Sequence, residues 1–346
     1  MENTLSFNNE DDLEYFLSIP YAETVELMKR LDGDFMILGI GGKMGPTLGR
    51  MIVLAAEEAG ISKKVYGVSR FSNRHLIPRL ENWGIRCISC DLLHPEEAAR
   101  LPKVKNIIFM AGRKFGQTGS DYLTWALNVI VPNNAAACFT ESRFVVFSTG
   151  SIYDLWPSDS DGPSESDTTY AIGEYANSCL GRERIFEYYS RTYGTKVLLF
   201  RLNYAIDLRY GVLLEIGKQV YEGKPNNLAM GYANVIWQGD ANNLAIRCLE
   251  LAACPPRILN VTGDKIRIRD IALRFGKIMD RKAVFSGNEA PTALLSSNTA
   301  MKGIFGAPPT SIEQMLRWIT DWIVRGGKSL DKPTHYQTRD GQFLDT

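Results

Sequence analysis

Regularly spaced glycines are the first residues in this sequence whose type and spacing suggest ligand binding. Residues 39–45 read Gly-Ile-Gly-Gly-Lys-Met-Gly, with Gly39, Gly42 and Gly45 three residues apart. Small residues let the backbone approach a pyrophosphate, and the N-terminus of a following helix attracts its negative charge. The segment is not a nucleoside-triphosphatase phosphate loop, because Met44 follows Lys43 where that motif requires Ser or Thr. The spacing therefore predicts a dinucleotide-binding turn.

The elements that must position this turn follow from the pattern around it. The apolar run 35–38 predicts a buried parallel strand, and residues 47–59 predict the helix after the turn. Five further strands are predicted at 64–68, 86–89, 106–110, 143–147 and 196–202. Helical stretches separate several of them, notably 121–139 and 169–193. Strands that alternate with helices predict an α/β fold with a doubly wound, Rossmann-type parallel sheet.

The chain divides into four regions by pattern. We expect an N-terminal helical extension at 1–33, a dinucleotide-binding Rossmann domain at 34–203, a mainly C-terminal substrate-binding region at 204–326, and an irregular tail at 327–346. In the third region, helices are predicted at 213–221, 241–253, 268–279 and 311–324, with a short strand at 258–261. We expect the extension to pack on the domain or on a neighbour.

Composition excludes several classes of protein. Lys and Arg together number 39, as do Asp and Glu, so the sequence shows no bias towards nucleic acid or other polyanions. The apolar runs are too short to span a bilayer, and the N-terminus lacks the basic start and apolar core of a secretory signal, so a cytoplasmic location is expected. Cys87 and Cys90 form a C-x-x-C on a predicted strand, where residues three apart face opposite sides. We therefore predict no metal site.

Further segments match a known family in the right order. The third strand is followed by Cys90-Asp91-Leu92, the fourth ends in Met110-Ala111-Gly112, and Asn128 lies in the next helix. The later matches are Phe-Ser-Thr-Gly-Ser-Ile-Tyr at 147–153, Tyr175 with Glu183 following, Arg201-Leu202-Asn203, and Ile-Trp-Gln-Gly-Asp at 236–240. With the glycine turn, this series resembles the extended short-chain dehydrogenase/reductases, which include nucleotide-sugar epimerases and dehydratases. The resemblance covers roughly residues 35–325.

The resemblance implies roles for particular residues. Thr149 and Tyr175 take the catalytic places, and Ser151 and Asn203 face the substrate. A nicotinamide dinucleotide would be bound by Gly39, Gly42, Lys43, Met44, Gly45, Arg70, Asp91, Leu92, Ala111, Gly112 and Tyr175.

One departure concerns the family's active-site lysine, whose position holds Cys179, and no Tyr-x-x-x-Lys occurs anywhere in the chain. In the family, that lysine lowers the pKa of the tyrosine and holds the nicotinamide ribose. A thiol carries no positive charge at neutral pH and cannot do the same. Lys43 and Arg182 are the remaining candidates. Because Arg182 lies two helical turns beyond Tyr175, we interpret it as a surface or salt-bridged residue.

Two functions stay open. The first is an NAD(P)-dependent epimerase, dehydratase or reductase acting on a sugar or sugar nucleotide, which Thr149, Tyr175 and Asn203 favour. The second is a non-catalytic dinucleotide-binding sensor or scaffold module, which the missing lysine favours.

The cofactor and the oligomeric state are predicted separately. NADP is favoured over NAD because residues 68–74 after the second strand contain no acid, and Arg70, with Lys43 nearby, could pair with a 2′-phosphate. A homodimer is expected through the helices at 121–139 and 169–193, which match the family's intersubunit bundle and carry more apolar residues than one sheet face needs.

Overall fold

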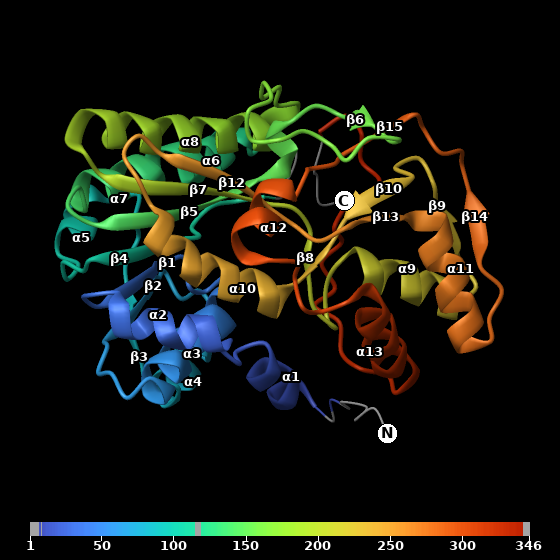
Figure 1. Ribbon diagram of the computed structural model, residues 1–346, viewed down its shortest axis with the longest axis horizontal. Coiled ribbons are helices and arrows are strands. Elements are labelled where there is room, and N and C mark those ends of the chain that lie inside the picture. The colour runs from blue at the N-terminus through green and yellow to red at the C-terminus, as the bar shows by residue number, and fades with distance from the viewer. Residues whose placement is uncertain (1–6, 8, 115–118, 342–346) are drawn as a thin grey trace.

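A seven-stranded parallel sheet forms the centre of the protein (Figure 1). The computed structural model describes residues 7, 9–114 and 119–341. Along the sheet the strands follow the order β12-β7-β5-β4-β1-β2-β3. Their bounds are β1 (Phe35–Leu38), β2 (Val65–Ser69), β3 (Ile85–Ser89), β4 (Asn106–Phe109), β5 (Arg143–Thr149), β7 (Lys196–Leu202) and β12 (Arg257–Val261). The predicted doubly wound α/β fold is confirmed.

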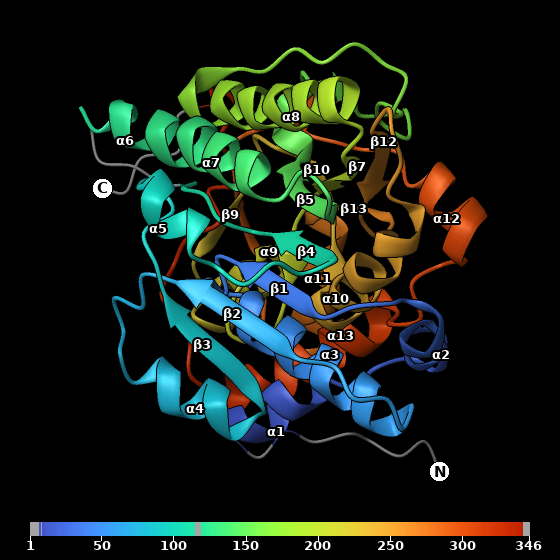
Figure 2. The same ribbon diagram turned by 90° about the vertical axis from the view of Figure 1, so that its left-hand side faces the viewer.

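Helices cover both faces of the sheet because alternate residues of each strand point to opposite sides. Phe35 and Ile37 pack with α2 (Ala22–Arg30), α3 (Gly45–Glu58) and α10 (Gln238–Arg247), and α4 (Leu76–Asn82) borders this face. Met36 and Leu38 pack on the other side with α5 (Pro95–Ala99), α7 (Val131–Cys138) and α8 (Gly173–Tyr193). Figure 2 shows α7 and α8 together above the sheet and α3 below it.

The structure differs from the predicted elements at definite points. The short strand near 258–261 joins the central sheet as β12, beside β7. The predicted helix 121–139 is α6 (Asp121–Trp125), a π-helical turn (Ala126–Ile130) and α7. Pro132 near the start of α7 has no N–H to donate, and its ring crowds the preceding turn, which the wider π turn relieves. Helix α8 begins only at Gly173, whose φ of +80° is left-handed.

A second hydrophobic core lies in the C-terminal region, on the right of Figure 1. Its helices are α9 (Val212–Tyr221), α11 (Ile268–Met279) and α13 (Ile312–Val324). Helix α12 (Thr299–Phe305) instead packs on β12, with Met301 in the core of the central sheet. The two-stranded pairs are β8 (Ala205–Ile206) with β11 (Ile236–Trp237), β10 (Tyr232–Asn234) with β13 (Lys265–Arg267), β9 (Pro225–Asn227) with β14 (Val284–Ser286), and β6 (Trp156–Pro157) with β15 (Thr292–Ala293). No helix in the described part of the chain has the length and hydropathy needed to cross a bilayer.

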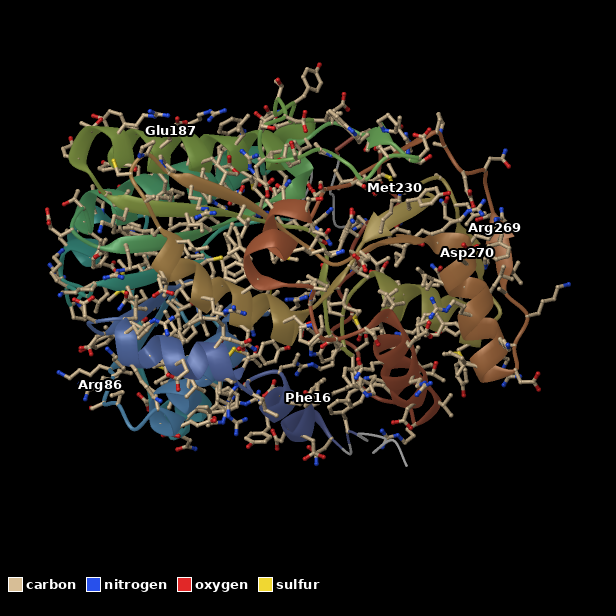
Figure 3. All side chains as sticks on the ribbon, viewed as in Figure 1. Phe16, Arg86, Glu187, Met230, Arg269 and Asp270 are labelled. Atoms are coloured by element: carbon tan, nitrogen blue, oxygen red, sulfur yellow. The ribbon has the colours of Figure 1, made fainter. Side chains whose placement is uncertain are left out.

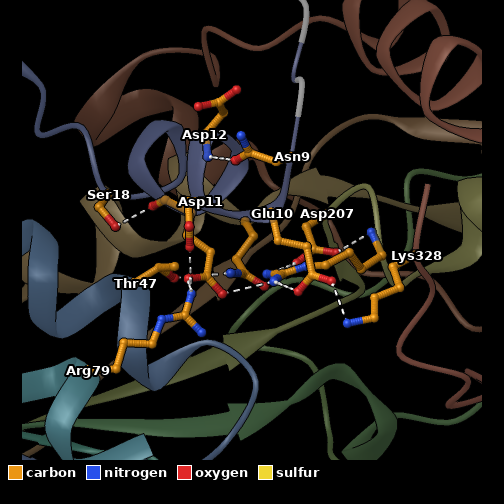
Figure 4. A network of polar contacts seen from close by, with 12 residues as sticks. Asn9, Glu10, Asp11, Asp12, Ser18, Thr47, Arg79, Asp207 and Lys328 are labelled. Carbon is orange, nitrogen blue, oxygen red and sulfur yellow. Dashed lines mark hydrogen bonds and ion pairs between the residues drawn. The ribbon is translucent and has the colours of Figure 1, made fainter. Parts of the chain in front are cut away.

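The N-terminal extension joins the two cores. Helix α1 (Glu10–Phe16) contributes Phe16, labelled in Figure 3, whose ring centroid lies 5.3 Å from that of Trp318. Buried Arg209 pairs with Glu14 of α1 at 2.8 Å and with Asp207 at 3.1 Å, and Glu14 also contacts Arg79 of α4 (Figure 4). Because leaving one of these buried charges unpaired would be strongly destabilising, this network holds α1 against both parts of the fold.

Candidate active site

The glycine turn after β1 is packed so closely that two of its positions exclude a side chain. Gly39 has a φ of +94°, and a Cβ there would lie 2.6 Å from the amide nitrogen of Ala111. A Cβ on Gly45 would lie 2.3 Å from the carbonyl oxygen of Ile40. The turn leads directly into the N-terminus of α3. The free N–H groups and the positive end of the helix dipole favour an anion at that place.

A cavity of about 370 Å³ opens beside this turn, at the carboxyl ends of β1 to β4. That volume is within the range of small-molecule sites, about 300–1,000 Å³. The predicted cofactor residues that line it are Gly39, Gly42, Arg70, Asp91, Leu92, Ala111 and Gly112. Met44 is buried where α3 begins. The residues present therefore fit a dinucleotide, with its pyrophosphate at the turn.

The two basic residues predicted for the cofactor site point to different places. Arg70 is exposed and lines the cavity just after β2. The Lys43 ammonium instead donates to the carbonyl of Ala205 in β8 at 3.0 Å and lies 3.8 Å above the ring of Tyr210. Burial lowers the pKa of Lys43 to about 7. The structure therefore directs Lys43 towards the C-terminal region and not to Arg70.

The predicted catalytic residues come together where β5 ends and α8 begins. The Thr149 hydroxyl accepts the backbone N–H of Ser151 at 3.1 Å and forms a hydrogen bond with Tyr175. Burial raises the pKa of Tyr175 well above its usual value, and the neighbouring Arg182 and Thr149 only partly offset this effect. At neutral pH the phenol is therefore protonated and in contact with Thr149.

Two buried polar side chains beside the Gly150 turn lack partners within the described residues. They are the amide nitrogen of Asn203 and the hydroxyl of Ser296. A Cβ on Gly150 would lie 2.8 Å from the Ser296 hydroxyl and 3.3 Å from the Asn203 nitrogen. Sequence analysis had singled out Asn203. It missed Ser296, because that residue lies between β15 and α12 in a segment without a motif.

Arg182 corrects a prediction. Instead of lying at the surface or in a salt bridge, it is buried, with Nη1 donating to the carbonyl of Phe147 at 2.8 Å and Nη2 to Oδ1 of Asn128 at 2.6 Å. The reason is that this face of α8 packs on β5 and on the π-helical turn. Cys179 is buried on the same helix, and burial raises its pKa, so the thiol is neutral.

Lys114, which follows β4, is a second cation near the site that sequence analysis missed. Its ammonium contacts the carbonyl of Thr334 at 3.4 Å and interacts electrostatically with Glu215 and Cys179. Burial lowers the pKa of Lys114 to about 8. Within the described ranges, no group of His, Cys, Asp and Glu side chains is arranged to hold a metal ion.

The sequence of the chain was compared with families of known proteins. Residues 36–206 match the sequence profile of the NAD dependent epimerase/dehydratase family. No curated protein matches the chain in sequence.

Solved structures share the fold. The UDP-glucuronic acid 4-epimerase of Bacillus cereus in complex with NAD has a TM-score of 0.70 at 18% identity, covering 85% of this chain and 100% of that one. The dTDP-glucose 4,6-dehydratase of Streptomyces venezuelae, with NAD bound, has a TM-score of 0.70 at 19% identity, with coverages of 85% and 98%. The UDP-glucose 4-epimerase of Thermus thermophilus in complex with NAD has a TM-score of 0.66 at 18% identity, with coverages of 83% and 98%. At these identities, the likeness shows a common fold.

The close contact at Gly45 makes a testable prediction for the cofactor site. In Gly45→Ala, the new methyl must displace the Ile40 carbonyl, and overpacking of this kind costs about 1–3 kcal/mol. We expect NADPH affinity, measured by calorimetric titration, to fall about tenfold or more. Gly303→Ala, in α12 with open space around it, is the matched control and should bind normally. Equal affinity of Gly45→Ala and wild type would show that the turn does not hold the cofactor.

Proposed function

We propose that the protein is an NAD(P)-dependent enzyme of the epimerase/dehydratase family acting on a sugar or sugar nucleotide, because residues 36–206 match the sequence profile of that family. The observation that carries the proposal is the contact of Thr149 with Tyr175 at the end of β5. Strand β5 pairs with β4, which is followed by Ala111 and Gly112 in the wall of the cofactor cavity. A proton-transfer group therefore lies one strand away from that cavity.

The cofactor and the residues at the end of β5 would contribute different steps of the reaction. A bound nicotinamide would supply hydride exchange with a substrate carbon. Tyr175 exchanges a proton at its Oη with a substrate hydroxyl, and the Thr149 hydroxyl donates a hydrogen bond to the same oxygen. Ser151 holds Thr149 through its backbone N–H.

A hydroxyl-rich substrate suits the polar atoms beside the Gly150 turn. Burying a polar group without a partner costs about 1–3 kcal/mol, so the Asn203 amide and the Ser296 hydroxyl favour a ligand that bonds to them. Sugar hydroxyls provide such partners. The names of the structural relatives, a UDP-glucuronic acid 4-epimerase and a dTDP-glucose 4,6-dehydratase, point to the same substrate class.

The alternative is a dinucleotide-binding module without turnover. Cys179 favours it, because the buried thiol is neutral and supplies no positive charge to Tyr175. Tight cofactor binding without oxidation of any nucleotide sugar would support this second function.

The catalytic proposal predicts that Tyr175→Phe removes most activity and keeps cofactor affinity. Loss of an aligned proton-transfer group costs about 10²–10⁴ in rate. The measurement is the conversion of a panel of UDP- and dTDP-sugars followed by chromatography, because an epimerase or dehydratase returns the hydride to the sugar and produces no net NAD(P)H. Tyr188→Phe is the control, since Tyr188 lies exposed on the same helix. A Tyr175→Phe variant as active as wild type would place the chemistry elsewhere.

We propose that the cofactor is NADP rather than NAD, because Arg70 lines the cavity where an NAD site has an acid. A charge-assisted hydrogen bond to the 2′-phosphate contributes about 1.5–3 kcal/mol. Arg70→Ala should therefore lower NADP affinity roughly tenfold or more in calorimetric titration and leave NAD affinity unchanged. Arg74→Ala, exposed and outside the cavity wall, should alter neither. Tighter binding of NAD, insensitive to Arg70→Ala, would reject the proposal.

We also propose a homodimer through α6 to α8, which lie side by side at the top of Figure 2. These helices expose large apolar side chains, namely Tyr122, Trp125, Ile130, Tyr188 and Tyr193. Light scattering at micromolar concentration should give twice the mass of one chain. Ile130→Glu, which puts a charge into the proposed interface, should give the mass of one chain. A monomeric wild type would contradict the dimer.

A further inference from the structure

Helix α8 places three functional side chains along one face. Tyr175, Cys179 and Arg182 stand four and seven residues apart, which brings them to the same side of a helix. Tyr175 forms a side-chain hydrogen bond with Cys179, and the charge of Arg182 acts on both. The Arg182 guanidinium is directed towards the sheet, where it donates to the carbonyl of Phe147 in β5.

Neutral groups hold the Arg182 guanidinium. It donates to the carbonyl of Phe147 and to the side-chain oxygen of Asn128, and its Nε has no hydrogen-bond partner in the described part of the chain. No carboxylate in the described residues pairs with it. The carboxylate of the adjacent Glu183 forms an ion pair with Arg201 at 2.7 Å and accepts a hydrogen bond from the Ser148 hydroxyl at 2.6 Å.

The guanidinium also lies against the cofactor cavity. A Cβ on Gly112, which lines that cavity, would come within 2.3 Å of Nη2 of Arg182. Glycine at 112 is thus needed for the arginine to reach this place. The guanidinium thus touches the wall of the cofactor cavity, and its charge acts on Tyr175.

A buried cation with only neutral acceptors is costly, because desolvation of a charge is normally offset by an opposite charge. An anion that forms nearby would provide that offset. The titratable and charged groups that face Tyr175 and Cys179 are Arg182, Lys114 and Glu183. Glu183 is paired with Arg201, and Lys114 interacts with Glu215. Arg182 is therefore the cation best placed to stabilise a Tyr175 phenolate.

We propose that Arg182 is a positioning residue that takes over the electrostatic part of the lysine absent at position 179. This inference rests on the proposed function. In the oxidising direction the Tyr175 phenolate accepts the proton of the breaking substrate O–H bond at Oη, the electron pair of that bond forms the carbonyl, and the hydride of the same carbon would pass to a bound nicotinamide. Arg182 keeps its own protons throughout. A small, neutral side chain at position 179 is compatible with this role of Arg182, because a lysine there would place a second positive charge beside the guanidinium and repel it.

The proposal is tested on the acidity of Tyr175 itself, without turnover. A ring-fluorinated tyrosine at position 175 is a stronger acid than tyrosine, and its titration can be followed by fluorine NMR. An opposite charge within reach lowers a pKa by about 1–3. Arg182→Gln keeps hydrogen-bonding capacity without charge and should raise the titration midpoint by about 1 or more. Arg182→Lys keeps the charge and should stay near wild type.

Matched variants separate charge from structure. Arg184→Gln, on the same helix and paired with Glu187 at 2.9 Å, should leave the midpoint unchanged, and Figure 3 shows Glu187 on the outer side of α8. Adding Cys179→Lys to Arg182→Gln should restore the midpoint. Equal midpoints in wild type and Arg182→Gln would overturn the proposal, as would equal shifts in the Gln and Lys variants. Absence of turnover would count against the proposed function alone, because this titration does not use turnover.

Discussion

The close approach of Gly39 to Ala111 is the contact on which the rest of the site depends. It joins the glycine turn after β1 to the end of β4, and only a residue without Cβ permits it. Gly112 then lets Arg182 approach the end of β4, and Arg182 bonds to the carbonyl of Phe147 in β5. Because Thr149 lies two residues after Phe147 in β5, the same series of contacts connects the glycine turn with the candidate catalytic residues.

The orientation of α8 depends on a second set of buried polar contacts. Glu183 points into the fold, where it binds Arg201 of β7 and Ser148 of β5. Arg201 also donates to the hydroxyl of Tyr153 at 2.6 Å. Removing one member of such a network leaves a buried charge unpaired, which is strongly destabilising. The rotation of α8, and with it the direction of Tyr175, is therefore fixed by charges on the helix face opposite to solvent.

Local patterns in the sequence were enough for much of the fold. The strand, glycine turn and helix at 35–58 are specified by nearby residues, as are the apolar runs of the next strands. The place of β12 was not predictable in this way, because its pairing with β7 joins segments far apart in the chain. Its position at the edge of the sheet likewise depends on contacts between segments far apart in the chain.

The site shows the same division between local and distant information. Thr149 and Tyr175 follow from motifs, and the structure brings them together. The directions of Lys43 and Arg182 depend on what packs against them, namely β8 in one case and β5 with the π-helical turn in the other. Ser296 reaches the site from an irregular segment that is held by distant residues, with the backbone N–H of Ser296 bonded to Asn234 and that of Ser297 to Pro163. Residue type alone carries no such information.

The proposed function requires the cavity beside the glycine turn to hold a nicotinamide dinucleotide whose reactive ring faces Tyr175. A crystal structure of the protein with bound NADPH tests it most directly. We expect bound NADPH to have its pyrophosphate at the N-terminus of α3, its 2′-phosphate near Arg70, and its nicotinamide ring beside the Thr149 and Tyr175 hydroxyls. A nicotinamide ring turned away from Tyr175, or a dinucleotide bound outside this cavity, would contradict it.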